Sequence, residues 1–175
     1  TRTEAGLPLY GHELAGRFDI SPAGAGFAGY VKLHKPYFVG RSAYLAREKE
    51  RTLEIARFRM DEKGVRMPKN GDPVVNRKGR AIGWVTSAAV DVDGWILGLA
   101  YIESRYHRAG DEIGIFVLPA KPVLEKEDKS GLAPGDGVQL PEAATILTRF
   151  PAPDEVAHWR GAPVMSLPGF LPANE

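Results

Sequence analysis

The sequence predicts a mainly β protein built on a small antiparallel, Greek-key-like barrel, and two observations lead to this fold class. Gly contributes 20 and Pro 14 of the 175 residues; turns are therefore frequent, since their combined share of about 19% exceeds the roughly 12% of average proteins. Apolar residues recur with period two in short runs between residues 53 and 118, and turn signals separate these runs, as in small barrels and sandwiches. A chain of this length forms one domain, or two small ones, and buries a core without disulfides or metals.

The region before residue 53 is irregular apart from one helix. Gly and Pro punctuate residues 8–29, which favours packed loop. Residues 30–33 alternate enough for a short strand, and residues 42–51 predict a helix capped by Ser42. Arg41 opens this helix with a charge that opposes the helix dipole, which indicates a carboxylate partner elsewhere.

From residue 53 onward the pattern predicts strands joined by hairpins. The apolar parity changes within residues 53–60, so a bulge near Ala56-Arg57 is expected to restore one inward face. Asn76-Arg77-Lys78-Gly79 closes one hairpin, and Asp91-Val92-Asp93-Gly94 closes a second, where Asp-Gly favours a type I′ turn. Residues 111–118 are apolar on both parities and are expected to be covered on both sides.

The organisation along the chain follows from these elements. Four regions are expected: residues 1–52 with loops, a short strand and one helix; the barrel at 53–122; a charged, flexible insertion at 123–141; and a last strand over 144–150 followed by a tail, in 142–175. Six strand residues are expected to be mostly buried: Ile82, Trp84, Ile96, Leu99, Ile113 and Ile115.

Charge and composition exclude several classes of function. The chain has 23 Lys and Arg against 22 Asp and Glu, a formal charge of +1, which gives no reason to expect nucleic acid or an anionic membrane as partner. Cysteine is absent, which removes disulfides, thiolate nucleophiles and thiolate metal sites. No apolar run approaches the roughly 18 residues of a membrane span, and no signal peptide opens the chain. These features predict an intracellular protein.

The residue patterns supply no self-contained active site. The four histidines lie far apart without metal-ligand spacing, so no metal is expected. Gly24-x-Gly26-x-x-Gly29 follows no strand and opens no helix, which argues against a dinucleotide site. No catalytic residue is therefore assigned.

Three ordered sets of residues carry a family resemblance. The first is Arg2-x-Glu4-Ala5-Gly6-Leu7-Pro8-Leu9-Tyr10-Gly11-His12-Glu13-Leu14. The second comprises Ser21-Pro22, Ala25-Gly26-Phe27, Val31-Lys32 and Phe38-x-Gly40-Arg41-x-Ala43. The third comprises Gly64-Val65, Gly71-Asp72-Pro73-Val74, Gly79, Ile82-Gly83-x-Val85-Thr86-Ser87, Leu99-Ala100-Tyr101-Ile102 and Gly110. In this order and spacing they resemble the glycine-cleavage T-protein, or aminomethyltransferase, family, across residues 1 to about 118.

The resemblance implies the C-terminal portion of such a protein. Residues 1–52 would end an α+β folate-binding region, and residues 53–122 would be the family's C-terminal β-barrel. The implied activity is tetrahydrofolate-dependent one-carbon transfer, in which an aminomethyl group on a lipoylated carrier protein gives ammonia and a methylene-folate. The family's catalytic Asp lies in the N-terminal half, so that missing half is an expected partner and this chain alone is expected to be inactive. The implied location is the cytoplasm, or the mitochondrial matrix in a eukaryote.

Three folate-binding residues follow from the resemblance. Arg149, within Thr148-Arg149-Phe150, matches a family contact near the C-terminal end, and its guanidinium can fork onto a folate carboxylate. A plain surface arginine is the alternative. Tyr10 and Glu13 lie in the matched loop and are expected to face the folate cavity, with a domain-packing role as the alternative.

Two other functions remain open at this point. One is a related folate-dependent demethylase acting on small methylated amines or sulfonium compounds, because relatives of both kinds share the barrel. The other is a non-catalytic folate-binding or scaffold module.

The segment from Leu7 to Phe38 carries an expectation about the surface. It is rich in Leu, Tyr, Phe and Gly but lacks regular alternation. Its Leu7, Leu9, Tyr10, Phe27 and Tyr37 are therefore expected to be under-packed until the missing half or a second copy covers them.

Overall fold

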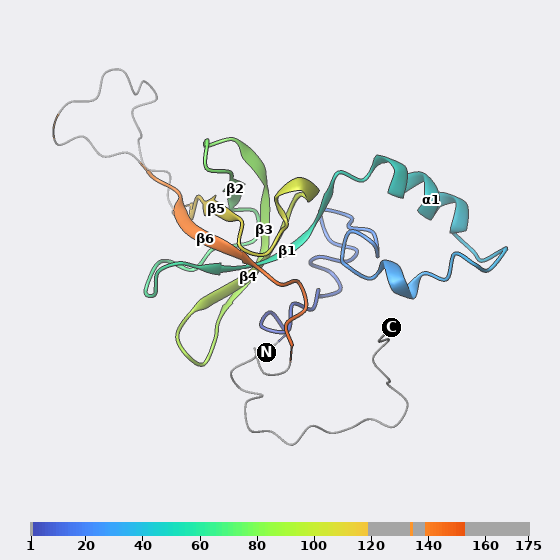
Figure 1. Cartoon of the computed structure of the whole chain (residues 1–175), viewed down its shortest axis with the longest axis horizontal. Helices are drawn as coiled ribbons and strands as arrows, with labels where there is room; N and C mark the ends of the chain where they lie inside the picture. Colours follow the sequence, from blue (N-terminus) through green and yellow to red (C-terminus); the bar gives the residue numbers. More distant parts are fainter. Residues whose placement is uncertain (1, 119–133, 135–138, 153–175) are drawn as a thin grey trace.

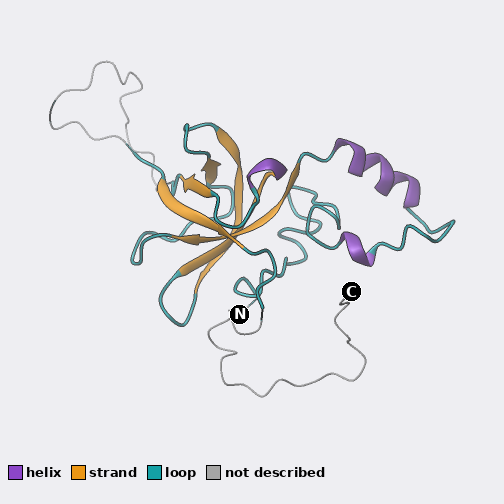
Figure 2. Ribbon diagram, in the orientation of Figure 1, coloured by secondary structure: helices purple, strands orange, loops and turns teal. Residues whose placement is uncertain are grey.

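A closed barrel of six antiparallel strands organises the molecule (Figures 1 and 2). The computed structural model describes residues 2–118, 134 and 139–152. The strands are β1 (Leu53–Met60), β2 (Pro73–Val75), β3 (Ala81–Val90), β4 (Ile96–Glu103), β5 (Glu112–Ile115) and β6 (Glu142–Leu147). Their order is β1-β4-β3-β2-β5-β6, and pairing of β6 with β1 closes the barrel.

The topology confirms the predicted Greek-key-like barrel. Strands β2, β3 and β4 form a meander, and β5 then returns to pair with β2, which is the Greek-key arrangement. Most of the expected insertion at 123–141 and the tail beyond residue 152 lie outside the described residues. The last strand ends at Leu147 rather than at residue 150.

Fourteen buried residues form the barrel core. They are Ala56, Phe58, Met60, Val74, Ile82, Val85, Ile96, Ala100, Ile102, Ile113, Ile115, Val117, Ala144 and Ile146. Five of the six residues expected to be mostly buried are buried, and the prediction is wrong for Trp84, which is 40% exposed. Trp84 lies on the outer face of β3, where it stacks on Phe18 with ring centroids 5.7 Å apart.

The bulge expected near Ala56-Arg57 in β1 is absent. The strand pairs with β4 in one continuous register from Leu53 to Arg59. Ala56 and Phe58 point into the barrel core, whereas Ile55 packs in a second cluster outside it. The parity change in the sequence arises because both faces of β1 are covered, not because the strand is bulged.

Both predicted hairpins are present, but each has a three-residue loop. The N–H of Asn76 donates to the carbonyl of Arg80, and the N–H of Asp91 donates to the carbonyl of Trp95. Gly94 has φ 81°, while Asp93 does not have the positive φ that a type I′ turn requires. The side chains of Asn76 and Asp91 each accept two backbone hydrogen bonds within their loops, and this favours the longer turn over the predicted type I′ turn.

The expectation that residues 111–118 are covered on both sides is wrong. Ile113, Ile115 and Val117 are buried, but Leu118 is 44% exposed. The strand occupies only Glu112–Ile115 and has one face in the core. The apolar residues of the opposite parity lie beyond Ile115, after the strand has ended.

The region before β1 divides into two parts. Residues 2–27, the N-terminal segment, lie as loop against the barrel, and residues 28–50, the arm, extend away from it (Figure 1). The arm holds the 3-10 helix η1 (Ala28–Tyr30) and the helix α1 (Arg41–Glu50); a third short helix, η2 (Ser104–Tyr106), follows β4. No residue of α1 is buried.

Two local predictions for the arm are wrong. Residues 30–33 form no strand, because the N–H groups of Tyr30 and Val31 donate back to the carbonyls of Phe27 and Ala28. Helix α1 is capped by Gly40 with φ 87°, not by Ser42. Gly40 takes this left-handed conformation without steric cost, and its carbonyl accepts the first helical hydrogen bond from Tyr44.

We expect Ile115→Ala to lower the free energy of unfolding by about 2–5 kcal/mol, because it leaves a cavity in a closed core. Ile115 has no exposed surface. Urea denaturation measures the effect, and Val92→Ala is the control, since Val92 is 68% exposed at a hairpin tip. An Ile115→Ala midpoint equal to that of the parent would contradict the assigned core.

Candidate functional site

The N-terminal segment covers the outer face of β1 and β4. Ile20 and Ala25 pack with Ile55 and Leu99 in a buried cluster outside the barrel core. Phe18 extends this cover by contacting Trp84 and Tyr101, with ring centroids 5.7 and 6.2 Å apart. The sheet therefore buries apolar side chains on both faces here, which fixes the segment by burial rather than by regular structure.

Glu13 is the buried polar anchor of this segment. Its side chain is completely buried. One carboxylate oxygen accepts the N–H of Leu9 at 2.8 Å, and the other accepts the hydroxyl of Ser87 at 2.8 Å. The guanidinium of Arg2 lies 3.6 Å from the carboxylate. Both oxygens are thus engaged by protein groups, which a buried carboxylate requires.

A β-bulge in β3 aims Ser87 at Glu13. The register with β4 shifts between Val85, opposite Ala100, and Ser87, opposite Leu99. Thr86 is the extra residue, and its hydroxyl donates to the carbonyl of Leu99 at 3.1 Å. Without this insertion, position 87 would point into the barrel, because side chains alternate along a strand.

The carboxyl group of Glu13 is held ionised. Burial would raise its pKa, but the hydrogen bonds from Leu9 and Ser87 and the nearby charge of Arg2 outweigh burial, so the pKa lies below its usual value. Hydrogen bonds to the charged form stabilise that form. Glu13 therefore provides a negative charge on the buried side of the N-terminal segment.

Arg149 fastens the same segment from the other end of the chain. It follows β6, and its guanidinium donates to the carbonyl of Gly6 and, at 3.1 Å, to the carbonyl of Ala25. The next residue, Phe150, stacks on Phe27 with ring centroids 5.9 Å apart. Burial lowers the pKa of Arg149 to about 10, and the charge of Glu13 opposes this shift. The guanidinium remains cationic near neutral pH.

Tyr10 lies on the outer side of this assembly. It is 79% exposed, and its neighbours Leu7 and Leu9 are 45% and 39% exposed. The loop that carries Tyr10 is closed by hydrogen bonds from the N–H groups of His12 and Leu14 to the carbonyl of Leu9. The structure therefore uses Glu13 and Arg149 to hold the same N-terminal segment, and the loop that Glu13 anchors carries Tyr10.

The under-packed surface expected for the N-terminal region is present. Tyr37 is 78% exposed, and Leu7, Leu9 and Tyr10 are exposed as well. Phe27 differs, because it is half-buried between Phe150 and Tyr30. Among the described residues, no group of three or more His, Asp or Glu side chains is arranged to hold a metal ion, and no described helix is long and apolar enough to span a membrane.

The chain is similar in sequence to known aminomethyltransferases. The chain is 37% identical over 118 residues to an aminomethyltransferase from Desulforamulus reducens, a match covering 66% of this chain and 31% of that protein. It is 39% identical over 125 residues to an aminomethyltransferase from Thermoanaerobacter pseudethanolicus, covering 70% of this chain and 32% of that protein. This chain is homologous to the C-terminal part of the aminomethyltransferases.

The fold agrees with this relationship. The glycine cleavage system aminomethyltransferase T from Bartonella henselae superposes with a TM-score of 0.59 at 21% identity, over 84% of this chain and 36% of that protein. No family model matches the sequence. The chain spans about a third of the length of the curated aminomethyltransferases it matches, and the resemblance inferred from the motifs is confirmed.

Two partners of Glu13 were not predicted from the sequence, although both lie in stretches that resemble the aminomethyltransferases. Arg2 and Ser87 both contact Glu13, and Ser87 lies 74 residues from Glu13 along the sequence. Both belong to stretches that match the family, Arg2 to the first and Ser87 to the third. The sequence therefore contained both stretches, but only the fold shows that their residues contact Glu13.

We expect Glu13→Gln to lower the free energy of unfolding by about 1–3 kcal/mol near neutral pH, because a charge-assisted hydrogen bond in a buried site is lost. The depressed pKa of Glu13 means that its ionised form stabilises the fold above the unfolded-state pKa. This contribution disappears as the pH falls through the folded-state pKa. Urea denaturation across that range should show parent and variant converging in acid. The control is Glu62→Gln at an exposed position; a pH-independent gap for Glu13→Gln would contradict the assignment.

We expect Gly6→Ala to detach the N-terminal segment from Arg149. A Cβ at Gly6 would lie 2.2 Å from the carbonyl oxygen of Arg149, and Gly6 has φ +71°. Gly11→Ala is a matched control, because Gly11 has φ +87° but a Cβ there would meet no heavy atom within 4 Å. Tryptic cleavage at Arg17 should accelerate much more in Gly6→Ala than in Gly11→Ala. Equal rates would show that backbone strain alone matters.

Proposed function

We propose that this chain forms the C-terminal part of a tetrahydrofolate-dependent aminomethyltransferase of the glycine-cleavage type. The proposed reaction transfers the aminomethyl carbon from a lipoylated carrier protein to tetrahydrofolate and releases ammonia. Homology to aminomethyltransferases over about two thirds of this chain carries the proposal. It favours this activity over a demethylase or a scaffold, because these relatives are named for the transferase.

The exposed apolar surface supports a site shared with another part of the protein. Leu7, Leu9 and Tyr10 stand on the outside of a segment whose inner side is fully packed. Contiguous exposed apolar side chains mark an interaction surface. In the proposal, this surface forms one wall of the folate cavity, and the part of the relatives that this chain does not match forms the others.

The three residues expected to bind folate take different roles in the proposal. Tyr10 contacts the folate, since it is free of packing partners on its exposed side. Glu13 accepts hydrogen bonds from Leu9 and Ser87, and Arg149 donates hydrogen bonds to Gly6 and Ala25. They therefore position the wall that carries Tyr10, and the Nε–H of Arg149 is buried without a hydrogen-bond partner among the described residues.

The proposal places the catalytic carboxylate outside this chain. Glu13, the buried carboxylate beneath Tyr10, has both oxygens engaged and is held ionised. A general acid or base must exchange protons near the operating pH, which an ionised carboxylate with a depressed pKa does poorly. The purified chain is accordingly expected to show no transfer by itself.

A chimera tests the function. This chain replaces the matched C-terminal third of the Desulforamulus reducens aminomethyltransferase, and transfer from an aminomethylated lipoyl carrier to tetrahydrofolate is measured. We expect the chimera to be active and the chain alone to be inactive. Tyr10→Ala in the chimera should raise the KM for tetrahydrofolate by about tenfold or more, because a stacking contact is removed.

Folding and function are separated by two controls. Val92→Ala, at a hairpin tip in the barrel, should leave the KM unchanged. A chimera that unfolds cooperatively and is monodisperse, yet has no transferase activity while the parent enzyme is active, would overturn the proposal. Turnover by the isolated chain would overturn its catalytic part.

A further inference from the structure

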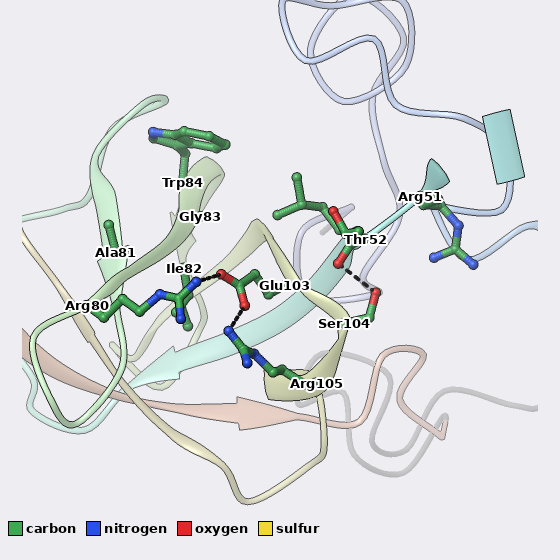
Figure 3. Close-up of a pocket in the computed structure, with 11 residues that line it drawn as sticks. Arg51, Thr52, Arg80, Ala81, Ile82, Gly83, Trp84, Glu103, Ser104 and Arg105 are labelled. Atoms are coloured by element: carbon green, nitrogen blue, oxygen red, sulfur yellow. Dashed lines mark hydrogen bonds and ion pairs between the residues drawn. The ribbon is translucent and has the colours of Figure 1, made fainter. Parts of the chain in front are cut away.

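We propose that a cavity on the outer face of the barrel binds a small aromatic carboxylate, independently of the folate wall. The cavity has a volume of about 660 Å³, which lies within the range of small-molecule sites. It opens where the cover supplied by the N-terminal segment ends. Three adjacent strands form it: the start of β1, the end of β4 and the start of β3 (Figure 3).

The floor of the cavity is apolar and continues the covered face. Leu53 and Trp84 have the same outward parity as Ile55 and Tyr101, which the N-terminal segment contacts. Phe18 stacks against the indole of Trp84, yet 40% of Trp84 remains exposed. A pre-positioned indole with exposed surface is suited to a planar apolar body.

The polar side of the cavity carries excess positive charge. Arg80 and Arg105 both pair with the one carboxylate of Glu103, and the Arg80–Glu103 distance is 3.2 Å. The side chains of Arg80 and Arg105 are 63% and 55% exposed, and each guanidinium has five N–H donors, so donors remain for a ligand. Figure 3 shows the side chains of Arg80 and Arg105 converging on that of Glu103.

The third arginine at the cavity does not add to this excess. Arg51 pairs with Glu48 at 2.8 Å and with Glu54 at 3.3 Å. Its guanidinium thus already has two carboxylate partners, so an anion would be repelled on this side of the cavity. The anion should therefore sit at Arg80 and Arg105, where a carboxylate can accept forked hydrogen bonds from guanidinium.

Together the floor and the charge define the ligand class. A carboxylate satisfies the two arginines, and an attached aromatic ring system covers Leu53 and Trp84. A ligand with charge alone would leave the apolar side chains of the floor exposed to water, and a neutral aromatic would leave two arginines sharing the single carboxylate of Glu103. The ligand of this cavity is thus a compact amphipathic anion and not an extended acidic peptide.

Binding of 2-naphthoate to the full chain tests the site by isothermal titration calorimetry. We expect saturable one-to-one binding, and binding of the neutral 2-naphthamide should be at least about tenfold weaker, because the charge-assisted hydrogen bonds are lost. Arg80→Ala and Arg105→Ala should each raise the Kd about tenfold. Arg77→Ala is the matched control: Arg77 is an exposed arginine that pairs with Glu112 instead.

Several outcomes would overturn the proposal. These are the absence of saturable 2-naphthoate binding, an equal loss in Arg77→Ala, or tighter binding of an acidic peptide with the same arginine dependence. If an alanine variant is not folded by circular dichroism, Arg80→Lys replaces it, since it keeps the charge but removes the guanidinium fork. Unchanged affinity in that variant would also count against the forked geometry.

Discussion

Burial on both faces of β1 and β4 is the constraint on which the rest of the structure depends. The inner face fills a closed barrel with residues such as Phe58 and Ile102, and the outer face presents Ile55 and Leu99, which are equally buried. A closed barrel can bury only its inner face by itself. The outer apolar face therefore requires a cover, and the N-terminal segment supplies it without regular secondary structure.

A cover made of loop must satisfy its backbone polar groups by other means. Glu13 accepts the N–H of Leu9, and Arg149 donates to the carbonyls of Gly6 and Ala25. These two side chains carry opposite charge; Glu13 belongs to the segment itself, whereas Arg149 reaches it from beyond β6. The same contacts that replace a strand ladder thus hold the loop that presents Tyr10, which joins the stability of the cover to the shape of the proposed folate wall.

The barrel strands could be predicted from the sequence, but the way in which the N-terminal segment covers them could not. Period-two runs and short turn motifs depend on local neighbours, so the strands and both hairpins were predictable. The turn type followed from the side-chain hydrogen bonds of Asn76 and Asp91. The parity change in β1 looked like a bulge because nothing local reveals a second covered face. The true bulge at Thr86 and the pairing of Glu13 with Ser87 depend on contacts between distant residues, which periodicity does not encode.

The arm is attached by a different kind of interaction from the segment. Tyr30 at the start of the arm packs its ring edge-on against Phe27, but the helix α1 buries no residue. The links of α1 to the N-terminal segment are polar: Glu48 accepts the hydroxyl of Ser21 at 2.7 Å, and Arg47 lies 3.2 Å from the exposed Asp19. Exposed ion pairs contribute little and weaken with salt, and a ten-residue helix is marginal alone. The barrel and its cover are therefore held by burial, while the position of α1 depends on weak polar links. Tyr37 and Val39 of the arm are among the most exposed large apolar side chains of the described residues, because the arm has no apolar partner comparable to the one that the N-terminal segment finds on β1 and β4.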